Sequence, residues 1–416
     1  MLIQYAVSNY KSIKDEIVIN FTAEQKDDEW VTECENKLNK PLYIYKAVGL
    51  VGPNASGKSN ILDSFIFALR FINSSFTRKE NRKINVEPFL LDPLTKMEDS
   101  TFEFIFMAGG TKYVYGFSVN EECVNEEYLY AYYSSRATTI FNREIGDKYD
   151  FRGTDLKVQN EIKSKMTKNR LYLPVAAEWG YERLKEPYNW FGSLTKQYMK
   201  NSIKELIQEV LGSEHGKRNM LDLIQKADIN VANIGYKIKE VNEKEYNLLK
   251  RLIDEVLSTM DESEGIRDIS IPTQDIEIYL EHEGKDGEIM RMPLEEDSAG
   301  TISAVENIAE ILYLGLNGGM MLEDELGKTY HSRLLKYILQ IFRRKEYNSA
   351  DAQLFFTTHN TKVFKYLEPA QIYLVDKEAD GSTFVKLLDD YKIDKEEDVE
   401  LGYLLGRFGA VPYTRG

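Results

Sequence analysis

Residues 52–59 of this 416-residue chain read Gly52-Pro53-Asn54-Ala55-Ser56-Gly57-Lys58-Ser59. This run satisfies the P-loop pattern, in which two glycines separated by four residues are followed by Lys and then Ser or Thr. An apolar segment, Tyr45 to Val51, precedes the run, and apolar residues at helical spacing follow it from Ile61 to Ile72. The sequence therefore predicts a strand, a phosphate-binding loop and a helix in series.

The residue types in this loop suit the binding of phosphate. Glycines let the backbone wrap closely around a ligand, and the loop amides and the helix N-terminus present positive dipoles to it. Lys58 would add a point charge at the β and γ phosphate oxygens, and the Ser59 hydroxyl can bind Mg²⁺. We therefore expect ATP and Mg²⁺ as cofactors. The expected ATP-binding residues of the loop are Gly52, Asn54, Ala55, Ser56, Gly57, Lys58, Ser59 and Asn60.

A second chemical signal is an apolar segment, Met320 to Leu322, that runs into Glu323, Asp324 and Glu325. We expect this segment to be a strand next to the P-loop strand, so that Asp324 reaches the Mg²⁺ shell and Glu325 faces the γ-phosphate. A carboxylate there can polarise the attacking water. Ser59 and Asp324 are thus the expected metal ligands, and Glu325 is the expected catalytic carboxylate. Glu323 occupies a position that is normally apolar, and its role stays open.

Two weaker patterns flank the carboxylates. Ser298, Gly300 and Thr301 open a predicted helix before them, and His359 follows the predicted strand Gln353 to Thr357 after them. Alone, the first is compatible with a helix cap and the second with a structural histidine. In this order they indicate a second phosphate-binding surface and a histidine that contacts a γ-phosphate.

The rest of the chain predicts an α/β protein. Residues 86–141 are rich in Phe, Tyr, Val and Thr, which favours an antiparallel sheet, and the last third alternates helices with strands, which favours a mostly parallel sheet. We expect an N-terminal ATPase lobe over 1–150, an inserted, mainly helical lobe over 151–295 and a C-terminal ATPase lobe over 296–416. No sustained heptad pattern is visible, so we expect no long coiled coil.

Composition excludes several classes of protein. Apolar residues make up 43% and charged residues 29%, as in ordinary globular proteins. Two cysteines and four histidines argue against a disulfide framework or a zinc site. A net charge of −15 argues against nucleic-acid binding by bulk attraction, although local basic runs at 78–83, 163–170 and 343–345 stay candidates. No secretory signal or long apolar stretch is present, so we expect a cytoplasmic protein without membrane contact.

The motifs together resemble a known group of proteins. Asn9-Tyr10-Lys11-Ser12-Ile13, GPNASGKSN, DSAGT, GGMMLEDEL and TTHN are similar to the motifs of the RecF, SMC and OLD group of ABC-type ATPases. Within that group, the run from Pro88 through STFEF, Tyr115-Gly116-Phe117 and the ending at 402–410 resemble the compact RloA-like AAA ATPases of bacterial abortive-infection and anti-phage loci.

The resemblance implies that two heads pair head to tail. ATP would then lie between the P-loop of one head and Ser298, Gly300 and Thr301 of the other, in a dimer or a higher oligomer. His359 would be the switch histidine and would join Asp324 and Glu325 as a catalytic residue.

Two departures from the group's pattern stand out. Gly327 occupies a position where relatives commonly carry Asp, which puts communication across the dimer in question. No glutamine occurs between Gln25 and Gln159, so the usual Q-loop residue is unassigned. Glu178, after the strand-like segment Leu171 to Val175, is a candidate for that position.

Two classes of function follow from these expectations. The first is a nucleotide-dependent sensor or switch in a bacterial anti-phage system, which controls a separate effector such as a nuclease or toxin. The second is a DNA repair or maintenance ATPase that binds DNA directly. Small size, the missing coiled coil and the acidic balance favour the first. Fewer residues follow His359 than a typical separate domain needs, so we expect any nuclease to be another polypeptide.

Overall fold

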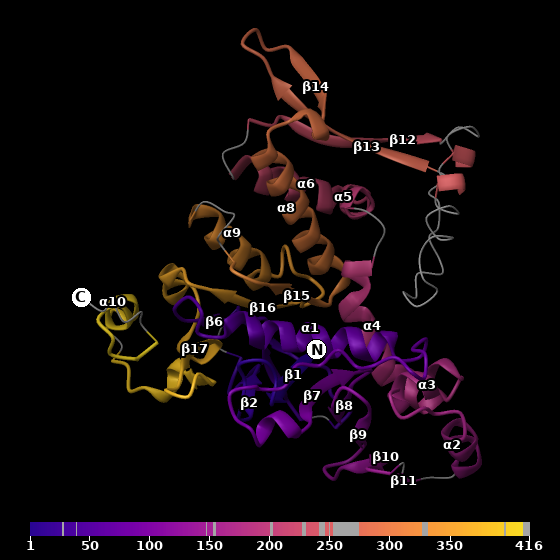
Figure 1. Cartoon of the computed structure of the whole chain (residues 1–416). Coiled ribbons are helices and arrows are strands. Elements are labelled where there is room, and N and C mark those ends of the chain that lie inside the picture. Colours follow the sequence, from indigo (N-terminus) through magenta and orange to yellow (C-terminus); the bar gives the residue numbers. More distant parts are fainter. Residues whose placement is uncertain are drawn as a thin grey trace. The chain divides into compact units, whose positions relative to one another are not determined.

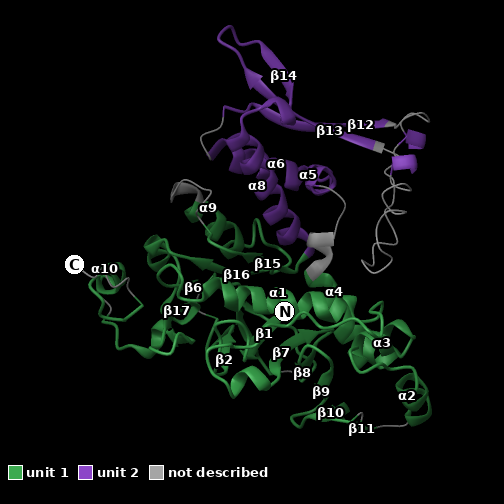
Figure 2. Ribbon diagram, in the orientation of Figure 1, with its two compact units in different colours: residues 1–195, 318–416 green, residues 196–317 purple. Residues whose placement is uncertain are grey.

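In the computed structural model the chain forms two compact units (Figure 2). Unit 1 comprises Met1–Thr195 and Gly318–Gly416, and unit 2 comprises Lys196–Asn317. Unit 2 is therefore an insertion between the two halves of unit 1. The structure describes the whole chain except residues 27–28, 39, 147, 153–154, 200–202, 227–229, 241–245, 249, 253–273, 327–331, 395–396 and 411–416.

A five-stranded sheet in unit 1 carries the P-loop (Figure 1). Its order is β15 (Met320–Glu323), β16 (Gln353–Thr358), β6 (Ala47–Val51), β17 (Ile372–Lys377) and β18 (Thr383–Leu387). The first four strands are parallel, and β18 is antiparallel to β17. Every residue of β6 and β16 is buried, as in parallel sheets that are covered on both faces. The prediction of an α/β fold with a mostly parallel sheet is confirmed.

The strand that ends in the carboxylates is not the neighbour of the P-loop strand, so that expectation was wrong. β16 lies between β15 and β6, because its six buried residues form parallel ladders on both sides. The register sets Glu323 opposite Phe356 and Thr358 opposite Val51. All three strands therefore end at the same edge of the sheet, where the loops that follow them meet.

The second large sheet of unit 1 is antiparallel and has seven strands in the order β11-β10-β9-β8-β7-β1-β2. The antiparallel sheet expected after residue 86 is present, and it also includes the first two strands of the chain. The strands are β1 (Leu2–Ser8), β2 (Ile17–Asn20), β7 (Ser100–Ala108), β8 (Thr111–Val119), β9 (Val124–Tyr132), β10 (Thr138–Glu144) and β11 (Lys148–Phe151).

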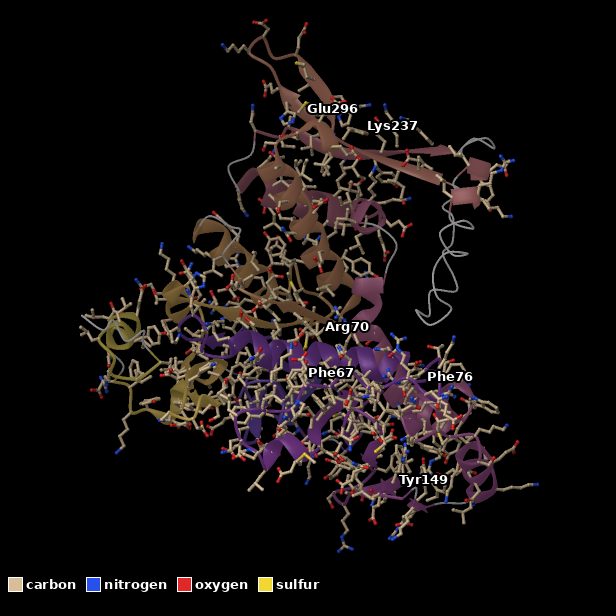
Figure 3. All side chains as sticks on the ribbon, viewed as in Figure 1. Phe67, Arg70, Phe76, Tyr149, Lys237 and Glu296 are labelled. Carbon is tan, nitrogen blue, oxygen red and sulfur yellow. The ribbon has the colours of Figure 1, made fainter. Side chains whose placement is uncertain are left out.

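Helix α1 (Lys58–Ser74) joins the two sheets through its aromatic residues. The ring of Phe65 lies 5.3 Å from that of Phe104 in β7 and 5.9 Å from that of Phe355 in β16. Phe67, labelled in Figure 3, packs 5.3 Å from Phe102 of β7. Because α1 begins at the P-loop, this shared core holds the N-terminus of the helix in place at the end of the loop.

The remaining elements of unit 1 are small. A three-stranded sheet has the order β3-β5-β4, and among the described residues unit 1 has four further α-helices, while α4 begins in unit 1 and ends in unit 2. The bounds are β3 (Thr22–Ala23), β4 (Val31–Glu33), β5 (Tyr43–Tyr45), α2 (Leu156–Lys163), α3 (Tyr172–Glu178), α4 (Glu182–Met199), α9 (Ser332–Arg343) and α10 (Val399–Leu404). Residues Thr361–Lys365 form a short 3-10 helix.

The strand-like segment Leu171 to Val175 is not a strand, because helix α3 begins at Tyr172. The reason is a buried carboxylate on β9. Glu127 is 0% exposed and accepts hydrogen bonds from the backbone N–H groups of Tyr172 and Leu173. These N–H groups have no acceptor within the first turn of a helix, so Glu127 stabilises the helical start.

Unit 2 contains a sheet as well as helices. Helices α5 (Ile203–Leu211) and α6 (Glu214–Lys226) pack against α8 (Ala299–Asn317). The three-stranded sheet has the order β12 (Asn233–Glu240), β13 (Gln274–Glu283) and β14 (Ile289–Pro293).

The expected boundaries at 150 and 295 do not coincide with those of the two units. Helix α8 packs on α5 and α6, so the residues from 296 to 317, assigned from the sequence to the C-terminal lobe, lie in unit 2. Among the described residues α8 is the longest helix, with 19 residues, and no long coiled coil occurs. In that same part of the chain, no helix has the length and apolar character needed to cross a membrane.

Candidate nucleotide-binding site

The P-loop connects β6 to α1, and its two glycines are required by close packing. A Cβ atom on Gly52 would lie 2.1 Å from the carbonyl oxygen of Val375, and one on Gly57 would lie 1.9 Å from Oγ1 of Thr383. Gly57 also has a φ of 103°, in the left-handed region that favours glycine. The loop is therefore fitted against β17 and β18 as well as against its own strand.

Lys58 is held inside the loop. It is 6% exposed, and its ammonium donates to the carbonyl oxygens of Gly52 (2.8 Å) and Pro53 (2.7 Å). Burial lowers the pKa of Lys58, and the nearby Asp324 and Glu325 carboxylates act in the opposite sense. A phosphate oxygen would be a stronger acceptor than these carbonyls, because its charge assists the hydrogen bond.

The two expected metal ligands lie together. Ser59 Oγ donates to Asp324 Oδ1 at 3.0 Å, and the Thr357 hydroxyl donates to the same oxygen at 2.6 Å. A hydroxyl and one carboxylate fit Mg²⁺, which takes oxygen ligands and is commonly held by one or two carboxylates plus substrate phosphates. Among the described residues no group of three or more His, Cys, Asp or Glu side chains that could hold a metal ion occurs.

Glu325 and His359 open into the same cavity as the P-loop. Glu325 has a φ of 59°, and its backbone N–H donates to the Thr357 hydroxyl at 2.8 Å. A left-handed conformation at a residue other than glycine is strained and commonly marks a functional position. The cavity has a volume of about 470 Å³ and is lined by Asn54, Ala55, Gly57, Lys58, Ser59, Asn60, Glu325, His359 and Lys377.

Three residues of this region were missed by the sequence analysis as site residues. Lys377, at the end of β17, lines the cavity and is exposed. Ser12 accepts a hydrogen bond from Asn60 Nδ2 at 2.6 Å, and Thr383 touches Gly57. The signal for Lys377 was its place at the end of an apolar strand, the position that also identified Asp324.

Ser298, Gly300 and Thr301 belong to unit 2 and are not among the residues that line the P-loop cavity. Ser298 Oγ accepts the Thr301 N–H at 3.2 Å and lies 2.9 Å from the Thr301 hydroxyl, so Ser298 caps α8. Asp297 in turn accepts the Ser298 N–H at 2.7 Å. Ser298 and Gly300 are exposed, which leaves the start of α8 accessible to a ligand.

Two other sequence expectations have different outcomes. Glu178 lies at the end of α3 and is not among the residues that line the cavity, so the Q-loop position stays unassigned. Gly327, where relatives commonly carry Asp, lies outside the described residues.

Two of the basic runs lie side by side. Asn169 Nδ2 donates to the carbonyl oxygens of Lys79 and Arg82, both at 2.8 Å, which joins segments 78–83 and 163–170. Acidic side chains offset part of this charge through exposed ion pairs, which contribute little to stability. The pairs join Lys83 to Glu121 (2.8 Å), Lys168 to Glu122 (3.4 Å) and Lys165 to Glu161 (3.8 Å).

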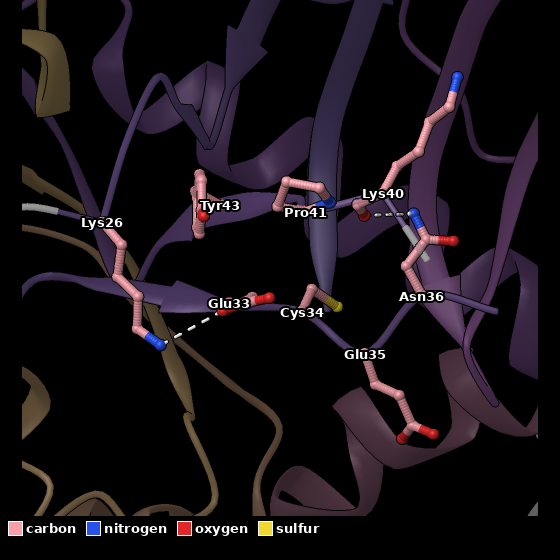
Figure 4. A pocket seen from close by; sticks show the side chains of 8 residues that line it. All are labelled: Lys26, Glu33, Cys34, Glu35, Asn36, Lys40, Pro41 and Tyr43. Carbon is pink, nitrogen blue, oxygen red and sulfur yellow. Dashed lines mark hydrogen bonds and ion pairs between the residues drawn. The ribbon is translucent and has the colours of Figure 1, made fainter. Parts of the chain in front are cut away.

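A larger cavity of about 730 Å³ shares no residue with the P-loop cavity (Figure 4). Lys26 and Glu33 form an ion pair of 3.4 Å at its rim. Burial raises the pKa of the Cys34 thiol, which favours the unreactive protonated form. The lining residues are Lys26, Glu33, Cys34, Glu35, Asn36, Lys40, Pro41 and Tyr43.

The comparison with protein families agrees with this geometry. Residues 47–364 match the family model described as an AAA domain, putative AbiEii toxin, Type IV TA system. The match begins with β6 and ends beyond His359, so it spans the P-loop, both carboxylates and the histidine. The chain belongs to this AAA domain family. It therefore carries an AAA domain over these residues. No curated protein matches the chain.

Solved structures with similar folds include three Smc heads. The Smc head bound to the C-terminal winged-helix domain of ScpA has 14% identity and a TM-score of 0.40, with 92% of this chain and 96% of that chain covered. The SMC head from Thermotoga maritima has 12% identity and a TM-score of 0.38, with 94% and 99% covered. An Smc head with an extended coiled coil, bound to the C-terminal domain of ScpA derived from Pyrococcus furiosus, has 13% identity and a TM-score of 0.39, with 92% and 95% covered.

Proposed function

We propose that this AAA-family chain binds ATP with Mg²⁺ at the P-loop and hydrolyses it. The observation that carries the proposal is the meeting of Lys58, Ser59, Glu325 and His359 around one cavity, with Asp324 hydrogen-bonded to Ser59. Each of these residues is of a type that phosphoryl transfer uses for positioning and for electrostatic stabilisation.

Each side chain has a separate task in this proposal. Lys58 would exchange its carbonyl acceptors for phosphate oxygens, and Ser59 and Asp324 would hold the metal ion. Bound Mg²⁺ would neutralise charge that develops on the phosphates. Glu325 accepts a hydrogen bond from the attacking water and so orients it, and His359 donates to the γ-phosphate.

Phosphate release by the purified chain tests this function. Release should require Mg²⁺, stop in EDTA and be lost in Lys58→Ala, because that variant removes the cation from the cradle. Phosphate release by Lys58→Ala at the parent rate would show that a contaminating enzyme, and not this site, performs the hydrolysis.

We further propose that two copies associate head to tail when ATP is bound, with Ser298, Gly300 and Thr301 of one copy on the γ-phosphate of the other. The support is the exposed start of the 19-residue helix α8, because helix N-termini attract anions. Ser298→Arg should block ATP-dependent association measured by light scattering. Glu288→Arg is the control variant, because it also introduces an arginine in unit 2 but in the exposed turn before β14, and it should leave association unchanged.

The biological role that fits best is a nucleotide-dependent switch in an anti-phage defence system that controls a separate nuclease or toxin. The family description names a toxin of a type IV toxin–antitoxin system, which supports a defence locus. Within the described residues, no group of three or more potential metal ligands offers a nuclease centre. The purified chain should therefore not cleave duplex DNA, single-stranded DNA or tRNA with Mg²⁺ or Mn²⁺. Cleavage that copurifies with the chain and is lost when carboxylates outside residues 323–325 are replaced would contradict this.

A DNA repair or maintenance ATPase is the second candidate. The observation in its favour is the adjacency of basic segments 78–83 and 163–170. If this surface binds DNA, Lys79→Glu with Lys165→Glu should weaken binding and reduce its dependence on salt. Unchanged binding in the double variant would remove the support for this candidate.

A further inference from the structure

A chain of hydrogen bonds beside the P-loop links segments that are far apart in the sequence. Asn60 Nδ2, on α1, donates to Ser12 Oγ at 2.6 Å. The hydroxyls of Ser12 and Thr383 lie 2.7 Å apart, and the Thr383 hydroxyl is 3.1 Å from the carbonyl oxygen of Ser56 in the loop. The chain of bonds therefore begins on α1 and ends on the loop backbone.

The direction of every bond in this chain is determined. The Thr383 hydroxyl has a single proton, and a carbonyl oxygen can only accept, so that proton goes to Ser56. The Ser12 hydroxyl must then donate to Thr383, and it accepts from the Asn60 amide. Removing the Thr383 hydroxyl would break two bonds and leave the Ser56 carbonyl without this donor.

Thr383 is also packed tightly against the loop. It is 3% exposed, and its hydroxyl occupies the space that a Cβ on Gly57 would need. Its own N–H donates to the Ser12 carbonyl at 2.7 Å, and β18 pairs it with Lys377 of β17. The backbone bond to Ser12 and the close packing against the loop thus fix the place of the Thr383 side chain.

The orientation of one peptide group follows from these contacts. In a trans peptide the C=O and the N–H point in opposite directions. Because Thr383 holds the Ser56 carbonyl, the Gly57 N–H in the same peptide group points away from Thr383. Gly57 lines the P-loop cavity, and loop N–H groups of this kind bind phosphate.

We propose that Thr383 is a positioning residue of the nucleotide site, which turns the Gly57 N–H towards phosphate by holding the Ser56 carbonyl. This inference rests on the proposed binding of ATP at the P-loop. It assigns a role to β18, which lies more than 300 residues after the loop and carries no recognised nucleotide motif.

The test measures the dissociation constants of Mg·ATP and Mg·ADP by calorimetry. Thr383→Val, which lacks the hydroxyl, should raise both dissociation constants about tenfold, as expected when a buried hydrogen bond is lost. Thr383→Ser keeps the hydroxyl and should bind within about twofold of the parent. Thr101→Val is a matched control, because it breaks a similar hydroxyl pair with Ser8 (2.6 Å) in the antiparallel sheet and should not change affinity.

A double-mutant cycle separates positioning from general loss of structure. Ser12→Ala should weaken nucleotide binding in the same way. The double variant, Ser12→Ala with Thr383→Val, should lose no more affinity than the more affected single variant, because both residues act through one chain of hydrogen bonds. Thr383→Val with parent affinity and an unchanged thermal midpoint would overturn the inference, as would Thr383→Ser that binds as weakly as Thr383→Val. Absence of ATP binding by the parent would instead overturn the proposed function.

Discussion

Replacing Thr357 by Val removes one hydroxyl that supports both carboxylate residues of the site. Thr357 is 0% exposed, donates to Asp324 Oδ1 at 2.6 Å and accepts the Glu325 N–H at 2.8 Å. A hydrogen bond to a charged acceptor contributes about 1.5–3 kcal/mol, which corresponds to about 10- to 150-fold in rate if the loss falls on the transition state. We expect slower hydrolysis by this factor and a higher Mg²⁺ requirement.

The assay is single-turnover hydrolysis at saturating ATP, with Mg²⁺ varied. Thr357→Ser keeps the hydroxyl and should hydrolyse ATP within about threefold of the parent, which separates the hydrogen bonds from the packing of the methyl group. Far-UV spectra and thermal midpoints establish that both variants are folded. Thr357→Val that hydrolyses ATP at the parent rate, with the parent Mg²⁺ dependence, would refute the assignment of Thr357 as the link between the two carboxylates.

Three further predictions follow from the site and its support. Burial lowers the pKa of Lys58, and only the protonated form attracts phosphate. As the pH rises, ATP affinity should therefore begin to fall at a pH below the ordinary lysine pKa of 10.5. The affinity of Lys58→Arg, which stays charged, should not change with pH over this range. Lys377→Ala should weaken ATP more than AMP in competition binding, whereas Lys386→Ala should change neither, and equal losses for ATP and AMP would contradict a phosphate contact. Glu127→Ala leaves two helix N–H groups and a tyrosine hydroxyl without their acceptor. The substitution should lower the free energy of unfolding by about 3 kcal/mol or more and the thermal midpoint by about 6 °C or more. Replacing the exposed Glu126 by Ala should have little effect on either quantity.

The sequence predicted the parts of the site that depend on local patterns. The P-loop is contiguous, so its strand, loop and helix could be placed from residues 45–72 alone. Asp324, Glu325 and His359 follow apolar strands, and parallel strands end at one edge of a sheet, which is why all three lie near the loop. The position of β16 between the other two strands could not be predicted, because order in a sheet depends on pairing between distant segments.

Residues that act through long-range contacts were missed for the same reason. Ser12 and Thr383 are separated by 371 positions, and nothing in either local sequence indicates that their hydroxyls meet. The segment from Leu171 has the composition of a strand but becomes helix α3 because Glu127, on another element, accepts its first N–H groups. The sheet of unit 2 left a visible signal, because the buried residues Ile276, Ile278 and Leu280 alternate with less buried residues along β13.

The most direct test of the central claim is ATP turnover by Glu325→Gln. The substitution keeps the P-loop, Lys58 and the Ser59–Asp324 pair, so Mg·ATP should bind with parent affinity. It removes the carboxylate that orients water, so phosphate release should fall by at least about a hundredfold. Tight ATP binding with almost no release of phosphate would support the assignment of this cavity as an ATP-hydrolysing site. Parent-rate hydrolysis by Glu325→Gln would contradict it.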